Sequence, residues 1–183
     1  KTVVTDETIF YPEGGGQCAD HGFLEGEKVY DVQENAGVIH HFVENAGKFK
    51  NGQTVLLKVN KERRDAITRH HSSTHMIIAA LRSLLGKHVW QCGSRKDEDE
   101  AHLDVTHYAR LTQEQLAQTE ALANETIWRA LPIYVKEMPR GEAEKKYSFR
   151  LYQGGGAIGA KLRIVEIKDF DVEACGGLHR KNT

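Results

Sequence analysis

The sequence predicts an α+β fold in which a small N-terminal β-barrel is followed by a two-layer α/β domain. Residues 1–60 contain short runs of β-forming residues, separated by turns of Gly, Asn and charged residues. From Lys61 the apolar residues recur every three or four positions, which is the period of a helix. With 183 residues, 39% of them hydrophobic, the chain can bury one substantial core, with or without a small satellite. We therefore divide the chain near Asn60, into residues 1–60 and 61–183.

The first part reads as antiparallel strands joined by tight turns, which would form a small barrel or a sandwich. The strand candidates are "KVYDV", "GVIHHFV" and "TVLLKV", and the turns between and before them include "EGGGQ", "LEGE", "ENAG" and "FKNGQ". Taken alone, the run Gly14, Gly15 and Gly16 is more typical of a hairpin turn than of a binding site.

The second part opens with a long helix that ends at Gly86. The inward-facing positions of this helix are Ile67, His71, Thr74, His75, Ile78, Leu81 and Leu85. A second helix is predicted from about Thr112, whose hydroxyl can form a capping box with Gln115, to near Leu131. Pro132 then prevents its continuation.

Strands are expected between and after the two helices. "HVWQCGS" and "EAHLDVTHY" flank the acidic turn "RKDEDE", and "PIYVKEM", "YSFRLYQ" and "KLRIVEIK" follow the second helix. No internal repeat or low-complexity segment is evident in the sequence.

Charge is distributed unevenly along a chain whose formal net charge is −1. Residues 1–60 carry 5 Lys/Arg and 9 Asp/Glu, a net of −4, whereas residues 61–183 carry 20 and 17, a net of +3. A polyanion should therefore prefer the second part, although two ordinary solvated surfaces would account for so small a difference equally well.

The cysteines and the hydropathy pattern predict a cytosolic protein. Cys18, Cys92 and Cys175 are too few and too scattered for a disulfide framework, so each is expected to be a free thiol or a metal ligand. No apolar run is long enough to span a membrane, and no secretory leader opens the sequence. Because the first residue is Lys1, we expect a piece of a longer protein.

The stretch "RHHSSTHMII" places His71 and His75 four residues apart on one helical face, where both rings can reach one cation. The pair alone is ambiguous, because an apolar helical face also tolerates histidines that bind nothing. Near the end of the chain "ACGGLH" adds Cys175 and His179, which complete a typical zinc set of one thiolate and three imidazoles.

The glycine-bearing loop after "KLRIVEIK" can aim both of its ligands at one point, because Gly176 and Gly177 give the backbone freedom. A buried free Cys175 and a surface His179 remain the alternative. Ser72 stands where the zinc proteases have their general-base Glu, so that class is excluded. Spacing does not decide between a structural site with four ligands and a catalytic site with an open position.

These motifs carry a resemblance to a known family. "HSSTH", "LGKHVWQCGS" and, about a hundred residues later, "CGGLH" resemble the editing domain of alanyl-tRNA synthetase, which is shared with free-standing alanyl-tRNA editing proteins. "FYPEGGGQCADHG" is similar to the glycine-rich segment of that family's barrel, which is itself similar to translation-factor barrels. "HVWQCGSRKDEDEAHLDVTHY" resembles the archaeal branch. The family pattern has Thr where this chain has Leu178, a position that is not a ligand.

The resemblance implies a zinc-dependent aminoacyl-tRNA deacylase that removes serine or glycine from tRNA specific for alanine. A pocket that selects alanine cannot strongly reject glycine or serine, so a second site must correct its errors. The implied partner is mischarged tRNA, the implied compartment is the cytoplasm, and the full-length synthetase would also bind ATP. The alternatives are a free-standing trans-editing deacylase and a non-catalytic tRNA-binding module whose zinc is structural.

By resemblance each site residue has an implied role. Thr74 and Gln91 are the implied catalytic residues, and the segment of Gly14, Gly15 and Gly16 is expected to lie near the substrate pocket. One zinc ion per chain is expected on His71, His75, Cys175 and His179. Thr74 would read the serine hydroxyl, although Thr in a helix often bonds instead to the carbonyl four residues earlier.

Several other polar residues receive ordinary interpretations. Ser72 and Ser73 lack a recognisable base and are expected to be helix-surface or capping groups rather than nucleophiles. The histidines expected to pack or lie on the surface are His40, His41, His88, His102 and His107. The basic residues expected as candidate phosphate contacts are Arg63, Arg64, Arg69, Lys145, Lys146, Arg150, Lys161, Arg180 and Lys181.

Overall fold

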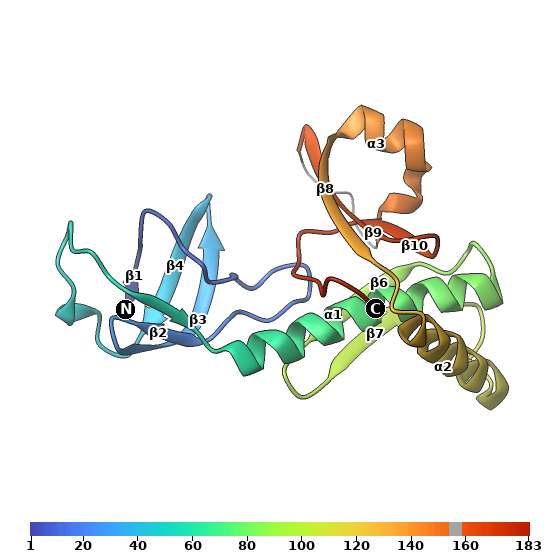
Figure 1. Cartoon of the computed structure of the whole chain (residues 1–183), viewed down its shortest axis with the longest axis horizontal. Helices are drawn as coiled ribbons and strands as arrows, with labels where there is room; N and C mark the ends of the chain where they lie inside the picture. Colours follow the sequence, from blue (N-terminus) through green and yellow to red (C-terminus); the bar gives the residue numbers. More distant parts are fainter. Residues whose placement is uncertain (154–158) are drawn as a thin grey trace.

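The computed structural model describes residues 1–153 and 159–183, and it is a mixed α/β arrangement of antiparallel sheets and helices (Figure 1). The N-terminal part forms a five-stranded sheet with the order β1-β4-β3-β2-β5. The strands of this sheet are β1 (Thr2–Val3), β2 (Gly22–Leu24), β3 (Glu27–Asn35), β4 (Val38–Val43) and β5 (Leu57–Val59), with the 3₁₀ helix η1 (Ala46–Lys48) after β4.

Two tight turns set the register of this sheet. Glu25 and Gly26 join β2 to β3, and Ala36 and Gly37 join β3 to β4, with positive φ at all four residues. Two consecutive positive φ angles are typical of the turns whose twist matches paired strands. The predicted strands around "KVYDV" and "GVIHHFV" are thereby confirmed.

The predicted β-barrel is not confirmed, because among residues 1–60 the sheet is open, with β1 and β5 at its edges. The edge strands have two and three residues, which is too short to curl round and pair with each other. One face of the sheet covers a small core of six buried residues: Phe10, Ala19, Leu24, Val29, Val32 and Val43.

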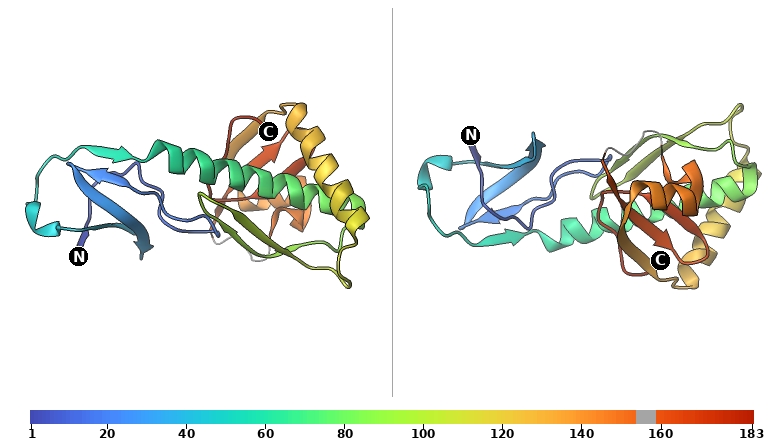
Figure 2. Two further views of the ribbon diagram at one scale, coloured as in Figure 1. Left: turned by 90° about the horizontal axis from the view of Figure 1, so that it is seen from below. Right: turned by 90° about the horizontal axis from the view of Figure 1, so that it is seen from above.

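Helix α1 (Lys61–Leu85) starts at the predicted boundary and links the sheet to the rest of the chain (Figures 1 and 2). Its N-cap is Asn60, whose side chain accepts a hydrogen bond from the backbone of Arg63. Its C-cap is Gly86, at φ 113°, as the sequence predicted. The division of the chain into two domains at this point stays a prediction.

The second part contains a hairpin, two further helices and a three-stranded sheet with the order β10-β9-β8. Its elements are β6 (Gln91–Lys96), β7 (Ala101–Val105), α2 (Gln113–Trp128), β8 (Ile133–Pro139), α3 (Arg140–Tyr147), η2 (Ser148–Leu151), β9 (Lys161–Ile167) and β10 (Asp171–Ala174). The predicted capping box of Thr112 and Gln115 is present at the start of α2.

The strand predicted at "YSFRLYQ" is wrong, because the structure has α3 and then η2 in this region. Ser148 adopts φ 59°, which interrupts any extended run, and Leu151 turns inward against Leu162 and Ile164 of β9. The strand-like composition was therefore overridden by burial of one side chain.

Helix α1 is the central element of the second part and buries two faces (Figure 2). On one face Met76 packs against Ile133, Val165 and Ile167 of the three-stranded sheet. On the other face the helix meets the β6–β7 hairpin through the cluster of Ile78, Leu81, Val89, Leu103 and Val105. Within residues 1–153 and 159–183 no helix combines the length and apolarity needed to cross a membrane.

Candidate metal centre

Four side chains from two distant segments converge beside α1. His71 and His75 come from adjacent turns of the helix, and Cys175 and His179 come from the segment that follows β10. One donor atom from each of the four lies within 4.8 Å of the others. Cys175 Sγ is 3.3 Å from His71 Nε2 and 3.4 Å from His179 Nε2. The structure thus brings together all four predicted ligands. The loop of Cys175 and His179 was predicted directly after the strand "KLRIVEIK", which is β9, but it follows the next strand, β10.

Gly177 explains how the ligand segment can approach the helix so closely. A Cβ built on this residue would lie 2.0 Å from His71 Cε1, so no other residue fits without displacing the ring. Gly176 has no such constraint, because nothing lies within 4 Å of its corresponding position. Arg163 fixes the same loop by donating to the backbone carbonyls of Cys175 and Gly177, at 2.7 and 2.8 Å.

Each imidazole has a polar neighbour on the side away from the cluster. His71 Nδ1 lies 2.7 Å from Oε1 of buried Gln17, which also accepts from the backbone N–H of Leu178. His179 Nδ1 lies 3.4 Å from Ser72 Oγ, and His75 Nδ1 lies 3.0 Å from a carboxylate oxygen of Glu173. Such outer partners orient ligand rings and select the tautomer whose other nitrogen faces the ion.

Sequence reasoning missed Gln17 and Glu173. Gln17 directly follows the glycine run, so a signal was present, but nothing in the sequence shows that it meets the first helix. Gln17 also accepts a hydrogen bond from the backbone N–H of Leu178, the position where the family pattern has Thr. The replacement of Thr by Leu leaves this hydrogen bond intact, since no side-chain atom of residue 178 takes part in it.

The glycine run forms a tight turn that sets Gln17 in place. Gly14 and Gln17 exchange backbone hydrogen bonds, and Gly16 lies so close to β6 that a Cβ there would be 2.3 Å from the carbonyl oxygen of Ser94. Gly15 and Gly16 have φ angles of 58° and 76°, which favour glycine. The contribution of Gly14, Gly15 and Gly16 to a substrate pocket stays a prediction.

Burial sets the protonation of the cluster. It lowers the pKa of His71 to about 2 and that of His179 to about 3, and it places the pKa of His75 well below its usual value. All three rings are therefore neutral at physiological pH and free to ligate a cation. Burial raises the pKa of the Cys175 thiol, and this rise is opposed by the Gly177 N–H and by the charges of Lys96 and Arg163.

The donor set fits zinc. Three neutral imidazoles and one thiol are soft and borderline ligands, which zinc prefers and which calcium and magnesium do not. His75 Nδ1 is also buried and lacks an aligned hydrogen-bond partner, as expected for a ring whose final orientation depends on a bound ion. His71, His75, Cys175 and His179 are the residues that would hold this ion.

Of the two implied catalytic residues, Thr74 directly precedes His75 on α1 and Gln91 lies on β6; the roles of both stay predictions. Thr74 is buried, and its hydroxyl donates a 2.8 Å hydrogen bond to the carbonyl of His70 four residues earlier. The helix-bonded alternative is therefore the arrangement found, and it leaves the oxygen able to accept a further bond. Gln91 is half-buried at the start of β6, opposite Val105.

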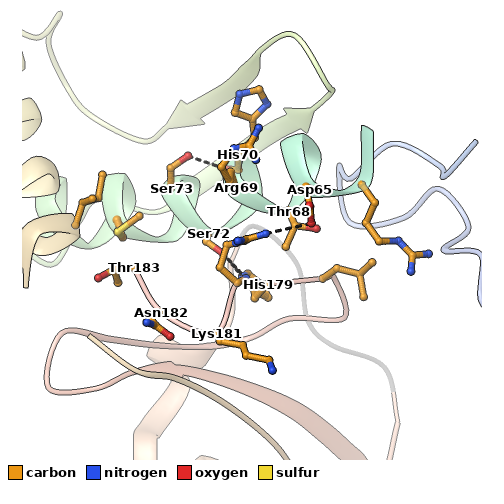
Figure 3. A pocket seen from close by; sticks show the side chains of 15 residues that line it. Asp65, Thr68, Arg69, His70, Ser72, Ser73, His179, Lys181, Asn182 and Thr183 are labelled. Carbon is orange, nitrogen blue, oxygen red and sulfur yellow. Dashed lines mark hydrogen bonds and ion pairs between the residues drawn. The ribbon is translucent and has the colours of Figure 1, made fainter. Parts of the chain in front are cut away.

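A groove of about 770 Å³ opens beside the cluster, between α1 and the C-terminal segment (Figure 3). His179 forms part of its wall, next to Ser72, Ser73 and Met76. Four of the basic residues proposed as phosphate contacts line it: Arg64, Arg69, Arg180 and Lys181. Arg63 does not, because it is buried against Asp97 and Glu98 in ion pairs.

His41, His88 and His107 do not belong to the cluster of His71, His75, Cys175 and His179. His41 is fully buried in the N-terminal sheet, with its ring nitrogens near Thr8 Oγ1 and the carbonyl of Val3, which confirms a packing role. Near the β6–β7 hairpin, His88 Nε2 lies 2.8 Å from His107 Nδ1.

The sequence of the chain is similar to a known family and to known proteins. Residues 1–63 match the family described as tRNA synthetases class II (A). The whole chain is 47% identical to part of the alanine–tRNA ligase of Methanococcus vannielii, and 48% identical to that of Methanococcus maripaludis. It is 49% identical to that of Thermococcus kodakarensis over 99% of its length. The chain spans 20% of the length of each of these relatives.

Proposed function

Because the chain is related over its whole length to a segment of archaeal alanine–tRNA ligases, we propose that it is the editing part of such an enzyme. Its reaction is hydrolysis of the ester that links serine or glycine to tRNA specific for alanine. The observation that carries this proposal is the convergence of His71, His75, Cys175 and His179 into one buried cluster. The setting is the cytoplasm, where such tRNAs are used.

One zinc ion per chain is the proposed cofactor. When bound, it supplies Lewis-acid chemistry that can orient the amino acid or polarise the ester carbonyl. Gln17, Ser72 and Glu173 contact the imidazoles from outside, and Arg163 holds the loop that carries Cys175. These residues keep the donor set in one arrangement, so that it need not be reorganised for each substrate.

No serine of α1 serves as a nucleophile in this proposal. Ser72 Oγ accepts from the backbone N–H of Arg180 at 3.0 Å and lies beside the ring of His179. Ser73 donates to the carbonyl of His70. The imidazole beside Ser72 is itself a proposed metal ligand, whose Nδ1 carries the ring proton when Nε2 ligates, so it cannot act as the base that would activate the hydroxyl as a nucleophile. Direct attack by water, positioned by Gln91, is the simpler route.

Substrate selection rests on Thr74. Its oxygen can still accept a hydrogen bond from the serine hydroxyl, although its own proton is given to His70. A site that hydrogen-bonds a substrate hydroxyl rejects an analogue lacking it far more strongly than an apolar pocket can. Alanine is thereby spared, and glycine is admitted by its small size with water in place of the hydroxyl.

The basic groove beside His179 is the proposed contact for the tRNA backbone. Arg69, Arg180 and Lys181 line this groove, and all three are exposed. Contacts to phosphates fix the register of a bound nucleic acid without reading its sequence. Their small number predicts weak binding that falls steeply with salt.

A second candidate function is a non-catalytic tRNA-binding module with structural zinc, which the count of four protein donors favours. The deciding experiment is deacylation of seryl-tRNA with the metal present, removed by a chelator and then restored. Loss and recovery of hydrolysis support the deacylase, whereas tRNA binding without hydrolysis in any state supports the module. A free-standing trans-editing protein would show the same activity as the deacylase, so activity alone does not separate those two.

A further inference from the structure

Behind the metal ligand His75 lies a second buried polar cluster whose centre is Arg82. Asp171 and Glu173 alternate along β10, so their side chains leave the same face of the strand toward α1. Both carboxylates are almost completely buried, with exposures of 0% and 2%. Buried carboxylates require a compensating partner, because desolvation disfavours their charged form strongly.

Arg82 is the cation that both carboxylates share. It lies seven residues after His75, on the same face of α1, and its Nη1 is 3.6 Å from oxygens of both Asp171 and Glu173. The other two nitrogens of its guanidinium donate hydrogen bonds to residues outside β10. Nε donates to the carbonyl of Val89 at 3.1 Å, and Nη2 donates to Gln153 Oε1 at 2.5 Å.

The cluster touches the metal ligand through one oxygen. Glu173 Oε2 lies 3.0 Å from His75 Nδ1, and an Asp171 oxygen lies 4.0 Å away. His75 Nδ1 has no aligned hydrogen-bond partner as the ring stands. Glu173 Oε2 is close enough to accept its N–H after a small rotation of the ring. The other nitrogen of the ring then faces Cys175 and the remaining ligands.

From this arrangement we propose that Arg82 and Glu173 are positioning residues for the metal centre. Arg82 holds Glu173 against His75, and Glu173 fixes the tautomer and the orientation in which His75 ligates the ion. The inference rests on the proposed function, because it presupposes that the four-residue cluster binds zinc.

The same residues do not form a second metal site. His75, Asp171 and Glu173 could in principle gather around one cation. Arg82 already places a positive charge 3.6 Å from both carboxylates, and a further cation at that point would be repelled by it. We therefore expect one bound zinc rather than two.

Arg82 also connects the metal side to the strand that carries Gln91. Its guanidinium lies 5.5 Å from the centre of the Trp90 ring, and it bonds the carbonyl of Val89 just before β6. A displacement of Arg82 would therefore change the contacts of Glu173 with His75 and the packing of Val89 and Trp90, which directly precede Gln91. Trp90 provides an intrinsic fluorescent reporter for this link, provided that Trp128, the other tryptophan, is replaced by Phe.

The test measures zinc affinity by competition with a chromophoric chelator. Glu173→Gln keeps the shape of the side chain and replaces its carboxyl group by an amide, and the matched control Glu166→Gln makes the same change at a partly exposed ion pair with Lys136. We expect about 10- to 100-fold weaker zinc binding by Glu173→Gln and no change in the control. Arg82→Lys, which keeps the charge but not the fork, should lie between them.

Two further readouts separate positioning from loss of folding. Circular dichroism should show native secondary structure for each variant, and the absorption spectrum of the cobalt-substituted chain should change in Glu173→Gln but not in Glu166→Gln. If Arg82→Lys fails to fold, Glu173→Gln alone decides. Glu173→Gln that binds zinc within about threefold of the unmodified chain, with the same cobalt spectrum, overturns the inference.

The outcomes also separate this inference from the proposed function. An unmodified chain that binds no zinc overturns both. An unmodified chain that binds zinc and shows the expected variant effects, yet hydrolyses no aminoacyl ester, overturns the deacylase and leaves the positioning roles standing.

Discussion

Replacing Gly177 by Ala should disable the metal centre, because this glycine is where the ligand loop crosses α1. The added Cβ would lie 2.0 Å from Cε1 and 2.4 Å from Nδ1 of His71, and 2.9 Å from Oε1 of Gln17. Ordinary van der Waals contact begins at 3.4 Å. The ring of His71, or the loop with Cys175, must therefore move by more than an ångström.

A shift of that size is large for a metal site, in which ligand distances are held to within about 0.2 Å. Since misplacement of an outer partner alone lowers metal affinity about 10- to 100-fold, direct displacement of a ligand should lower it by at least about 100-fold. That factor corresponds to about 2.7 kcal/mol of binding free energy. Overpacking should also lower the free energy of unfolding of the metal-free chain by about 1–3 kcal/mol.

Zinc titration against a competing chelator measures the first effect, and urea unfolding of the metal-free chain measures the second. Gly176→Ala is the matched control, because a Cβ at that neighbouring glycine meets nothing within 4 Å. It should bind zinc as the unmodified chain does. Equal zinc affinity for Gly177→Ala and Gly176→Ala would refute the reasoning, since it would mean that the close approach to His71 has no bearing on the site.

Three other changes probe the surroundings of the cluster. Gln17→Met removes the acceptor for His71 Nδ1 and the Leu178 N–H, so zinc affinity should fall about 10-fold in the same titration; an unchanged value would make Gln17 merely structural. Thr74→Val should leave the zinc content unchanged but lower the transition-state stabilisation in single-turnover hydrolysis of seryl-tRNA by about 1–3 kcal/mol, and that of glycyl-tRNA by less. Equal losses on the two substrates would assign Thr74 to helix bonding alone. Arg69→Glu with Lys181→Glu should weaken tRNA binding and flatten its salt dependence at unchanged zinc content, and unaltered binding would place the tRNA on another face.

The metal ligands could be predicted from the sequence because their signals are local. His71 and His75 are one helical turn apart, and Cys175 and His179 flank the two glycines that let their loop turn. Helix ends were equally readable, since Asn60 and Gly86 cap α1 through contacts within a few residues. Each of these inferences depends on neighbours along the chain.

The outer partners could not be predicted, because each depends on a contact across the fold. Gln17 and His71 are 54 positions apart in the sequence, and Arg82 meets β10 only because of how α1 packs on that strand. The same dependence explains the errors. Arg63 looked like a surface cation until tertiary packing buried it, and "YSFRLYQ" has strand-like composition although Leu151 is needed in the core.

The most direct test of the central claim is single-turnover hydrolysis of seryl-, glycyl- and alanyl-tRNA, all on tRNA specific for alanine, by the zinc-loaded chain. We predict that the seryl and glycyl esters are cleaved, that the alanyl ester is spared, and that a chelator abolishes cleavage until zinc is restored. A zinc-loaded chain that cleaves none of the three esters faster than buffer, or all three equally, would contradict the claim.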